Sequence, residues 1–208
     1  MSDARDTREH ILNASFMLFL QKNFKEVTMK EIVERTGLSK GAFYHYFSSK
    51  EQVFEEVMDH FFAAGIKQNF ESYSFETLKE FYQDYIKDAI AKMRSFKNLR
   101  TDNNEETFST NHYFLIFDAM KMLPSYKKKL LDNNQEELKY WKKIVHIAKK
   151  SGEIKTTMTD EQIAKLFIYS GDGLGMQLIM SDPSAQKMEK FKSELQSIWD
   201  GLYNALKG

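Results

Sequence analysis

The side chains between Gly37 and Lys50 could donate hydrogen bonds to phosphates and to the edges of bases. This stretch holds two lysines, one histidine and two tyrosines, and it holds no carboxylate that would repel a phosphate. Its small residues Gly41 and Ala42 would permit a close approach. We therefore predict a nucleic-acid interface here. The residues predicted to contact DNA are Thr28, Lys30, Ser39, Lys40, Gly41, Ala42, Tyr44, His45, Tyr46 and Lys50.

Some of these residues have alternative roles. Tyr44 and Tyr46 could be half-buried packing residues, and Tyr46 could lean inward. His45 could be a surface histidine without a partner, and Ser39 could serve only as a helix cap.

Motifs for catalysis or metal binding are not found in the sequence. Cysteine is absent, the five histidines never fall at metal-ligand spacing, and no Gly-x-Ser-x-Gly elbow occurs. The glycines from Gly171 to Gly175 lie in a helical apolar pattern without a preceding strand or the Lys-Ser/Thr ending of a phosphate loop. The acidic segment from Asp132 to Glu137 lacks the central glycine of a calcium loop and is interpreted as a solvated face. We predict no catalytic residue, metal or cofactor, and therefore no enzyme.

Composition favours an all-α globular protein. The chain has 208 residues, of which 42% are hydrophobic and 29% charged, and only two prolines and nine glycines interrupt its helical patterns. A net charge of zero argues against a general nucleic-acid coat but allows a local basic patch. The N-terminus lacks the order of a secretory signal, and no apolar run reaches the ~18 residues of a membrane span. The cytoplasm is the expected location, with no membrane partner.

Start and stop signals divide the first 60 residues into four short helices. Apolar spacing predicts a helix from about residue 7 to 22. The Thr28–Glu31 capping box opens a second helix that stops at Gly37. Ser39 can cap a third helix over residues 40–47, and Ser48 with Glu51 resembles a second capping box that opens a fourth. Two helices joined at the short turn around Gly37 predict a helix-turn-helix, held from inside by Ile32, Val33, Leu38, Phe43 and Phe47.

The remaining chain is also predicted to be helical, in segments of about 75–95, 110–123, 124–151, 159–181 and 183–207. The polar residues 101–106 are the expected mobile loop. We predict a DNA-binding domain over residues 1–50 and a larger helical domain over residues 51–208.

The N-terminal pattern resembles the DNA-binding signature of the TetR family of regulators, over about residues 8–58. The residues that carry it are Thr28, Ile32, Gly37, Leu38, Ser39, Lys40, Gly41, Phe43, Tyr44, Tyr46, Phe47, Lys50 and Glu51. The resemblance implies that residues 39–47 form the recognition helix and that Lys50 contacts phosphate. It departs from the family at Asn23, where glycine is usual, and at Val33, where alanine is common.

The resemblance implies that the larger domain senses a small molecule and forms a homodimer. Its many aromatic residues are predicted mostly to form the core, yet they also suit a pocket for an apolar or aromatic effector. Candidate effector-binding residues are Phe62, Tyr85, Tyr113, Phe117, Trp141 and Tyr169. Candidate dimerisation residues are Gly171, Leu174, Leu178, Leu195 and Trp199.

These observations predict a ligand-responsive transcription regulator, a repressor that leaves its pseudo-palindromic operator when the effector binds. One alternative is a helical ligand-binding protein or enzyme that keeps the N-terminal fold as a packing module. A second is a helical adaptor that binds other proteins. Activation in place of repression also remains open, because the sign of regulation depends on where the operator lies.

Overall fold

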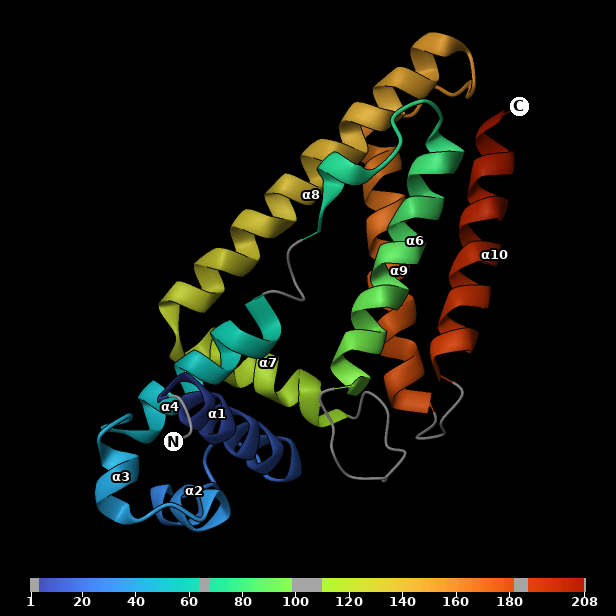
Figure 1. Cartoon of the computed structure of the whole chain (residues 1–208). Helices are drawn as coiled ribbons and strands as arrows, with labels where there is room; N and C mark the ends of the chain where they lie inside the picture. Colours follow the sequence, from blue (N-terminus) through green and yellow to red (C-terminus); the bar gives the residue numbers. More distant parts are fainter. Residues whose placement is uncertain (1–3, 64–67, 99–109, 182–186, 208) are drawn as a thin grey trace. The chain divides into compact units, whose positions relative to one another are not determined.

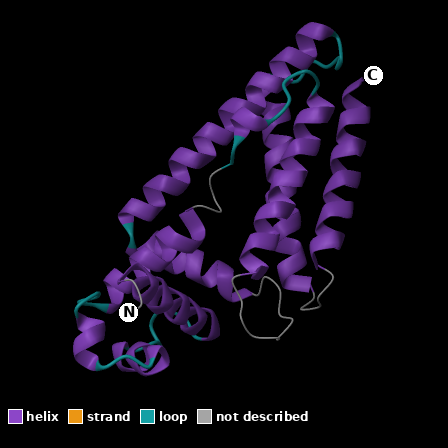
Figure 2. Cartoon of the chain, viewed as in Figure 1, coloured by secondary structure: helices purple, strands orange, loops and turns teal. Residues whose placement is uncertain are grey.

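The described part of the chain is built from helices and loops, which confirms the predicted all-α class (Figures 1 and 2). The computed structural model describes residues 4–63, 68–98, 110–181 and 187–207. None of the helices in these ranges combines the length and apolar character needed to cross a membrane.

The N-terminal helices follow the predicted order, with two differences. They are α1 (Ala4–Gln21), α2 (Met29–Thr36), α3 (Lys40–Tyr44) and α4 (Lys50–Val57). Helix α3 ends at Tyr44, three residues earlier than predicted. The expected second capping box is wrong: Ser49 caps α4 by accepting from the Gln52 amide, while the Gln52 side chain accepts from the Ser48 amide.

The rest of the chain forms longer helices close to the predicted ranges. After α4 come the π-helical segment η1 (Met58–Ala63) and the short 3₁₀ turn η2 (Phe70–Ser72). The following helices are α6 (Leu78–Asn98), α7 (Thr110–Met122), α8 (Pro124–Ser151), α9 (Asp160–Ser181) and α10 (Lys187–Lys207). The predicted start of the last helix at residue 183 and the mobile loop expected at residues 101–106 both lie outside the described residues.

The helices pack as two units, each with its own core. Among the described residues, unit 1 holds the chain up to Ala63 together with residues 110–130, and unit 2 holds residues 68–98, 131–181 and 187–207. Helix α8 therefore contributes its first turns to unit 1 and the remainder to unit 2. These packing units differ from the predicted division at residue 50, because α4 and α7 both pack against α1.

Phenylalanine rings fill the core of unit 1. Phe16 stacks on Phe61 with ring centroids 4.3 Å apart, and Phe19 meets the edge of Phe54 at 5.2 Å. Phe24, in the loop after α1, lies 4.6 Å from Phe54. Leu18 and Phe19 of α1 are both buried. These contacts fix α4 against α1.

A cluster around two tryptophans forms the core of unit 2. Trp141 stacks on Phe167 at 4.9 Å and meets the edge of Trp199 at 5.3 Å. The Trp199 indole donates to the Ser170 hydroxyl at 3.0 Å, and the Tyr82 hydroxyl donates to Asp200. Helices α6, α8, α9 and α10 all supply residues to this cluster.

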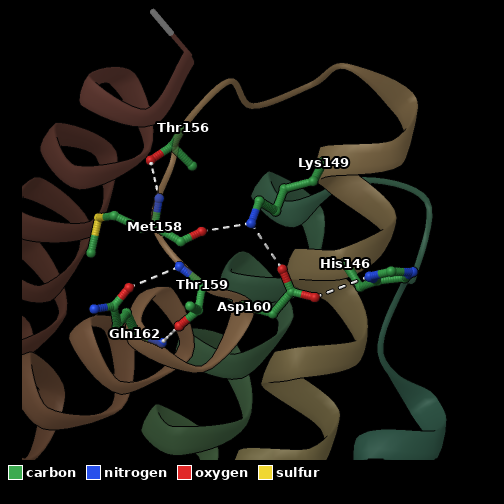
Figure 3. A network of polar contacts seen from close by, with 7 residues as sticks. All are labelled: His146, Lys149, Thr156, Met158, Thr159, Asp160 and Gln162. Carbon is green, nitrogen blue, oxygen red and sulfur yellow. Dashed lines mark hydrogen bonds and ion pairs between the residues drawn. The ribbon is translucent and has the colours of Figure 1, made fainter.

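Polar contacts hold the corner between α8 and α9 (Figure 3). A capping box opens α9: the Thr159 hydroxyl accepts from the Gln162 amide, and the Thr159 amide donates to the Gln162 side chain. Asp160 accepts from His146 Nδ1 and from Lys149 Nζ, each at 3.0 Å. Lys149 also donates to the Met158 carbonyl oxygen at 2.6 Å. The last turns of α8 are thereby fixed to the first turn of α9.

Candidate nucleic-acid interface

The turn between α2 and α3 has the geometry that a helix-turn-helix requires. Gly37 has a φ of 67°, in the left-handed region, and its amide donates to the Glu34 carbonyl oxygen at 3.2 Å. His10 Nε2 of α1 lies 2.9 Å from the Thr36 carbonyl oxygen. The predicted need for glycine at this position is confirmed, because L side chains rarely adopt this conformation.

Three of the predicted inward residues are fully buried. Ile32, Phe43 and Phe47 have 0% exposure, while Val33 and Leu38 are only half-buried. The Arg8 guanidinium of α1 lies 4.7 Å from the centre of the Phe47 ring and is paired with Glu56 of α4. Arg8 thus ties α1, α4 and the residues after α3 together. Sequence reasoning missed this residue, because no local pattern marks its partners.

One side of α3 is left to solvent. Lys40, Gly41, Ala42, Tyr44 and His45 are exposed, and Tyr44 retains 43% of its surface. Lys40 Nζ lies 5.9 Å from the centre of the Tyr44 ring, and the His45 and Tyr46 rings lie 5.4 Å apart. Tyr46 is half-buried, so the expectation that it leans inward is partly met. These side chains occupy the face that the sequence assigns to DNA.

Two of the predicted DNA contacts have well-defined capping roles. The Thr28 hydroxyl accepts from the Glu31 amide at 3.2 Å and donates to the Glu31 carboxylate at 2.9 Å. Its one proton is therefore not available to a phosphate while the capping box is closed. The Ser39 hydroxyl accepts from the Ala42 amide at 3.2 Å, which leaves its proton free for a phosphate.

Lys50 is held by backbone carbonyl groups of the loop between α1 and α2. Its Nζ donates to the Phe24 oxygen at 2.9 Å and to the Val27 oxygen at 2.7 Å, and it lies 4.3 Å from the centre of the Phe24 ring. An ammonium group has three N–H donors, so one remains. The predicted phosphate contact of Lys50 would use that third donor. The other two donors of Lys50 fix the start of α4 to the loop between α1 and α2.

Acidic residues of α2 are paired with lysines. Glu31 accepts from Lys22 at 2.5 Å, and this hydrogen bond, with those from Thr28, lowers the Glu31 pKa to about 2. Lys30 lies 3.8 Å from Glu34, and both side chains are highly exposed. A pair this exposed is weak, so Lys30 is free to reach a phosphate. Pairing reduces the repulsion that α2 would offer to DNA.

The comparisons with known proteins agree with this geometry. The model of the family described as "Bacterial regulatory proteins, tetR family" matches residues 11–57, which span the helix-turn-helix and α4. The matched residues all lie in unit 1.

Two curated relatives each match a part of the chain. It is 30% identical over 95 residues to the uncharacterized HTH-type transcriptional regulator YfiR of Bacillus subtilis, covering 42% of this chain and 46% of YfiR. It is 39% identical over 59 residues to the HTH-type transcriptional repressor NemR of Escherichia coli, covering 28% of this chain and 30% of NemR. The matched segments therefore span less than half of these relatives.

The fold of nearly the whole chain is shared with solved structures. The structure described as a "putative TetR-family transcriptional regulator" from Mesorhizobium loti matches with a TM-score of 0.60 and 16% identity, covering 99% of this chain and 98% of the other. At this identity the likeness concerns the fold alone.

Of the six candidate effector-binding residues, two lie close together in the structure. Tyr85 and Trp141 lie in the core of unit 2 with ring centroids 5.6 Å apart. Tyr169 is 62% exposed on α9, and Phe117 is 53% exposed on α7 in unit 1. Their roles in effector binding stay predictions, because an apolar helical spacing does not indicate whether a side chain faces inward. The side chains of Phe62 and Tyr113 lie outside the described residues.

The candidate dimerisation residues face the interior of their own protomer. Leu174 and Leu178 are 7% exposed, Leu195 is 1% exposed, and Trp199 is fully buried. A Cβ atom on Gly171 would lie 3.3 Å from the Trp199 ring, so this glycine admits α10 of the same chain. We correct the assignment of these five residues. The outward apolar residues of α9 and α10 are Leu166, Tyr169, Met180 and Ile198.

A buried carboxylate in unit 2 was wrongly interpreted as part of a solvated face. Glu137 is only 8% exposed, and its Oε1 accepts from the Tyr85 hydroxyl at 2.7 Å. Burial above all, together with the charge of nearby Asp172, raises the Glu137 pKa to about 7 against the opposing effect of the Tyr85 hydrogen bond. Its position one helical turn before buried Trp141 was the signal that could have revealed its burial.

Proposed function

We propose that this protein is a ligand-responsive repressor that binds a pseudo-palindromic DNA operator as a homodimer. The observation that carries the proposal is the α2–α3 arrangement, in which buried Phe43 and Phe47 anchor α3 while Lys40, Tyr44 and His45 face outward. No carboxylate interrupts residues 37–50. Repression is supported by the similarity to NemR of Escherichia coli, an HTH-type transcriptional repressor.

A dimer is required because one short recognition helix reads few base pairs. Two copies would place their α3 helices in successive major grooves, roughly 34–36 Å apart. We assign the dimer face to the outward apolar residues of α9 and α10, which are Leu166, Tyr169, Met180 and Ile198. On each helix these residues lie opposite the ones that fill the core of unit 2.

The proposed effector is a small apolar or aromatic molecule bound in unit 2 near Tyr85 and Trp141. Helix α8 supports the coupling, because it begins in unit 1 and continues into unit 2. Within unit 1 its first turns contact the α4 region: the Ser125 hydroxyl donates to Glu55 at 3.1 Å, and Lys129 Nζ donates to Asp59 at 2.6 Å. A shift of α8 on effector binding would move α4 and change the spacing of the α3 helices.

Binding of the full-length chain to the DNA upstream of its own gene, measured by gel shift at several salt concentrations, tests the proposal. We expect a sequence-selective shift that weakens with rising salt, and weaker binding by Tyr44→Phe and His45→Ala. Gln83→Glu on α6 is the matched control and should bind normally. A folded chain that shifts no DNA selectively would contradict the proposal.

The effector response has its own test. A compound that lowers operator affinity must itself bind less tightly to the DNA complex, by the same factor. Calorimetric titration of the free protein and of the complex measures both affinities. If compounds that bind unit 2 leave operator affinity unchanged, the response is excluded while DNA binding stands.

A further inference from the structure

The first turn of α3 presents three exposed residues, Lys40, Gly41 and Ala42, before the buried anchor Phe43. In helix-turn-helix proteins the N-terminal residues of the recognition helix contact base edges, while the first helix of the motif crosses the DNA backbone. The identity of these three residues therefore decides which bases the protein can distinguish.

Gly41 has no packing role within the chain. A Cβ atom built on it would meet nothing within 4 Å, and its φ is outside the left-handed region. Alanine would be more favourable than glycine in a helix. Because glycine has no side chain, the backbone of the first turn is exposed, and the edge of a base pair can approach it closely.

The first turn offers a donor, apolar groups and a single side-chain acceptor. Lys40 makes no hydrogen bond or ion pair with the part of the chain that the structure describes, and its ammonium can only donate. The acceptor is the Ser39 hydroxyl oxygen, and one of its two lone pairs already accepts from the Ala42 amide. Tyr44 and His45, which could accept, stand at the end of α3.

Residues 37–50 also lack the side chains that recognise adenine and cytosine. Adenine is read by the amides of Asn or Gln, and the cytosine amino group by a carboxylate. None of these four residue types occurs in the stretch. Guanine presents the acceptors N7 and O6 in the major groove, which suit a lysine, and thymine presents a methyl group, which suits an apolar contact.

We propose that direct base readout by α3 is confined to guanine and thymine. Lys40 donates to N7 and O6 of a guanine, and the bare backbone at Gly41 with the methyl group of Ala42 packs against the C5-methyl group of a thymine. This inference rests on the proposed function and adds the class of base that the operator must present in each half-site.

Base analogues test the inference on an operator selected from random DNA with the full-length chain at fixed salt. Each guanine is replaced in turn by 7-deazaguanine, which lacks the N7 acceptor, and each thymine by uracil, which lacks the methyl group. We expect an affinity loss of about tenfold for at least one guanine, and of about threefold or more for at least one thymine. Replacing adenines by 7-deazaadenine should leave affinity unchanged.

Protein variants test which residue causes the affinity loss with each base analogue. Lys40→Ala should abolish the response to 7-deazaguanine, and Ala42→Gly the response to uracil. Gly41→Ala should weaken operator binding about tenfold without lowering thermal stability. Lys30→Ala on α2 is the matched control and should keep both responses.

The outcomes separate this inference from the proposed function. The guanine and thymine readout is overturned if selective DNA binding is unaffected by both 7-deazaguanine and uracil, or if it depends on adenine N7. In either case the proposed function as a DNA-binding regulator still stands. The inference is also overturned if Lys40→Ala keeps the guanine response. If a folded chain selects no sequence from the pool, the proposed function itself fails.

Discussion

Lys50 shows how tertiary contacts set the role of a single residue. The sequence places a lysine at the start of α4 next to the predicted interface. Its two carbonyl partners, Phe24 and Val27, lie 26 and 23 residues earlier in the chain. A residue expected to contact phosphate therefore also closes the loop between α1 and α2.

Replacing Lys50 with Met should destabilise unit 1. The change leaves two part-buried carbonyl oxygens without their donor, which should cost roughly 1–3 kcal/mol of unfolding free energy. Hydrogen exchange of the α1 and α2 amides measures the change locally. Lys40→Met removes the same charge from an exposed side chain and should leave exchange unaltered. Equal protection in both variants would contradict the anchoring role.

At the scale of secondary-structure elements, turns and caps decide where each helix begins and ends. Gly37 separates α2 from α3 because its φ of 67° sends the chain away from the axis of α2. Nothing lies within 4 Å of a Cβ atom built at this position, so the requirement for glycine is conformational and not steric crowding by neighbours.

Gly37→Ala should therefore lower the unfolding free energy of unit 1 by about 1–2 kcal/mol, which is the strain of a left-handed L residue. Gly41→Ala is the control, since its site is equally open and its φ is ordinary. Hydrogen exchange across α2 and α3 distinguishes the two variants. If both are equally stable, backbone strain at Gly37 is not the reason for the glycine.

The α8–α9 corner depends on Asp160. Burial opposes its ionisation, yet the hydrogen bonds from Lys149 and His146 outweigh this and lower its pKa. A lowered carboxyl pKa adds stability above the pKa of the unfolded chain, and this stability is lost as the pH falls through the folded value.

Asp160→Asn should reduce the unfolding free energy of unit 2 by about 1 kcal/mol at neutral pH, and by less in acid. Fluorescence of the chain's two tryptophans measures this, because both lie in the core of unit 2. Thr157→Ala, at an exposed position in the same loop, should have no effect. A loss that stays constant down to acid pH would contradict the charge-based explanation.

At the scale of the whole molecule, buried Glu137 makes the stability of unit 2 depend on pH. Its pKa is raised from 4.5 to about 7, so the folded chain binds this proton more tightly than the unfolded chain. The associated stability is fully present below pH 4.5 and is lost as the pH rises through 7. The full difference is about 3 kcal/mol.

Glu137→Gln should remove this decline, so that unit 2 of the variant is more stable than the native protein at pH 8 and similar to it at pH 5. Urea unfolding followed by tryptophan fluorescence at both pH values gives the comparison. Glu136→Gln changes an exposed neighbour and should retain the native decline. An unchanged pH dependence in Glu137→Gln would show that another group causes it.

The proposed homodimer is also a property of the whole molecule. Tyr169 is 62% exposed on the proposed dimer face, so Tyr169→Glu should convert the dimer to monomers in light scattering and weaken operator binding. Gln83→Glu adds the same carboxylate to an exposed position of α6 and should remain dimeric. A dimer that survives Tyr169→Glu would place the interface elsewhere.

The sequence alone determined the helices, the Thr28 and Thr159 capping boxes, the Gly37 turn and the outward donors of α3. These features depend on interactions within about four residues, which local patterns record. Only the tertiary structure decided that Trp199 and Leu174 face inward while Tyr169 faces outward, that Glu137 is buried and that Lys50 binds two distant carbonyl groups. Those outcomes depend on which helix packs against which, and a periodic apolar pattern is the same whether its partner is a helix of its own chain or another molecule.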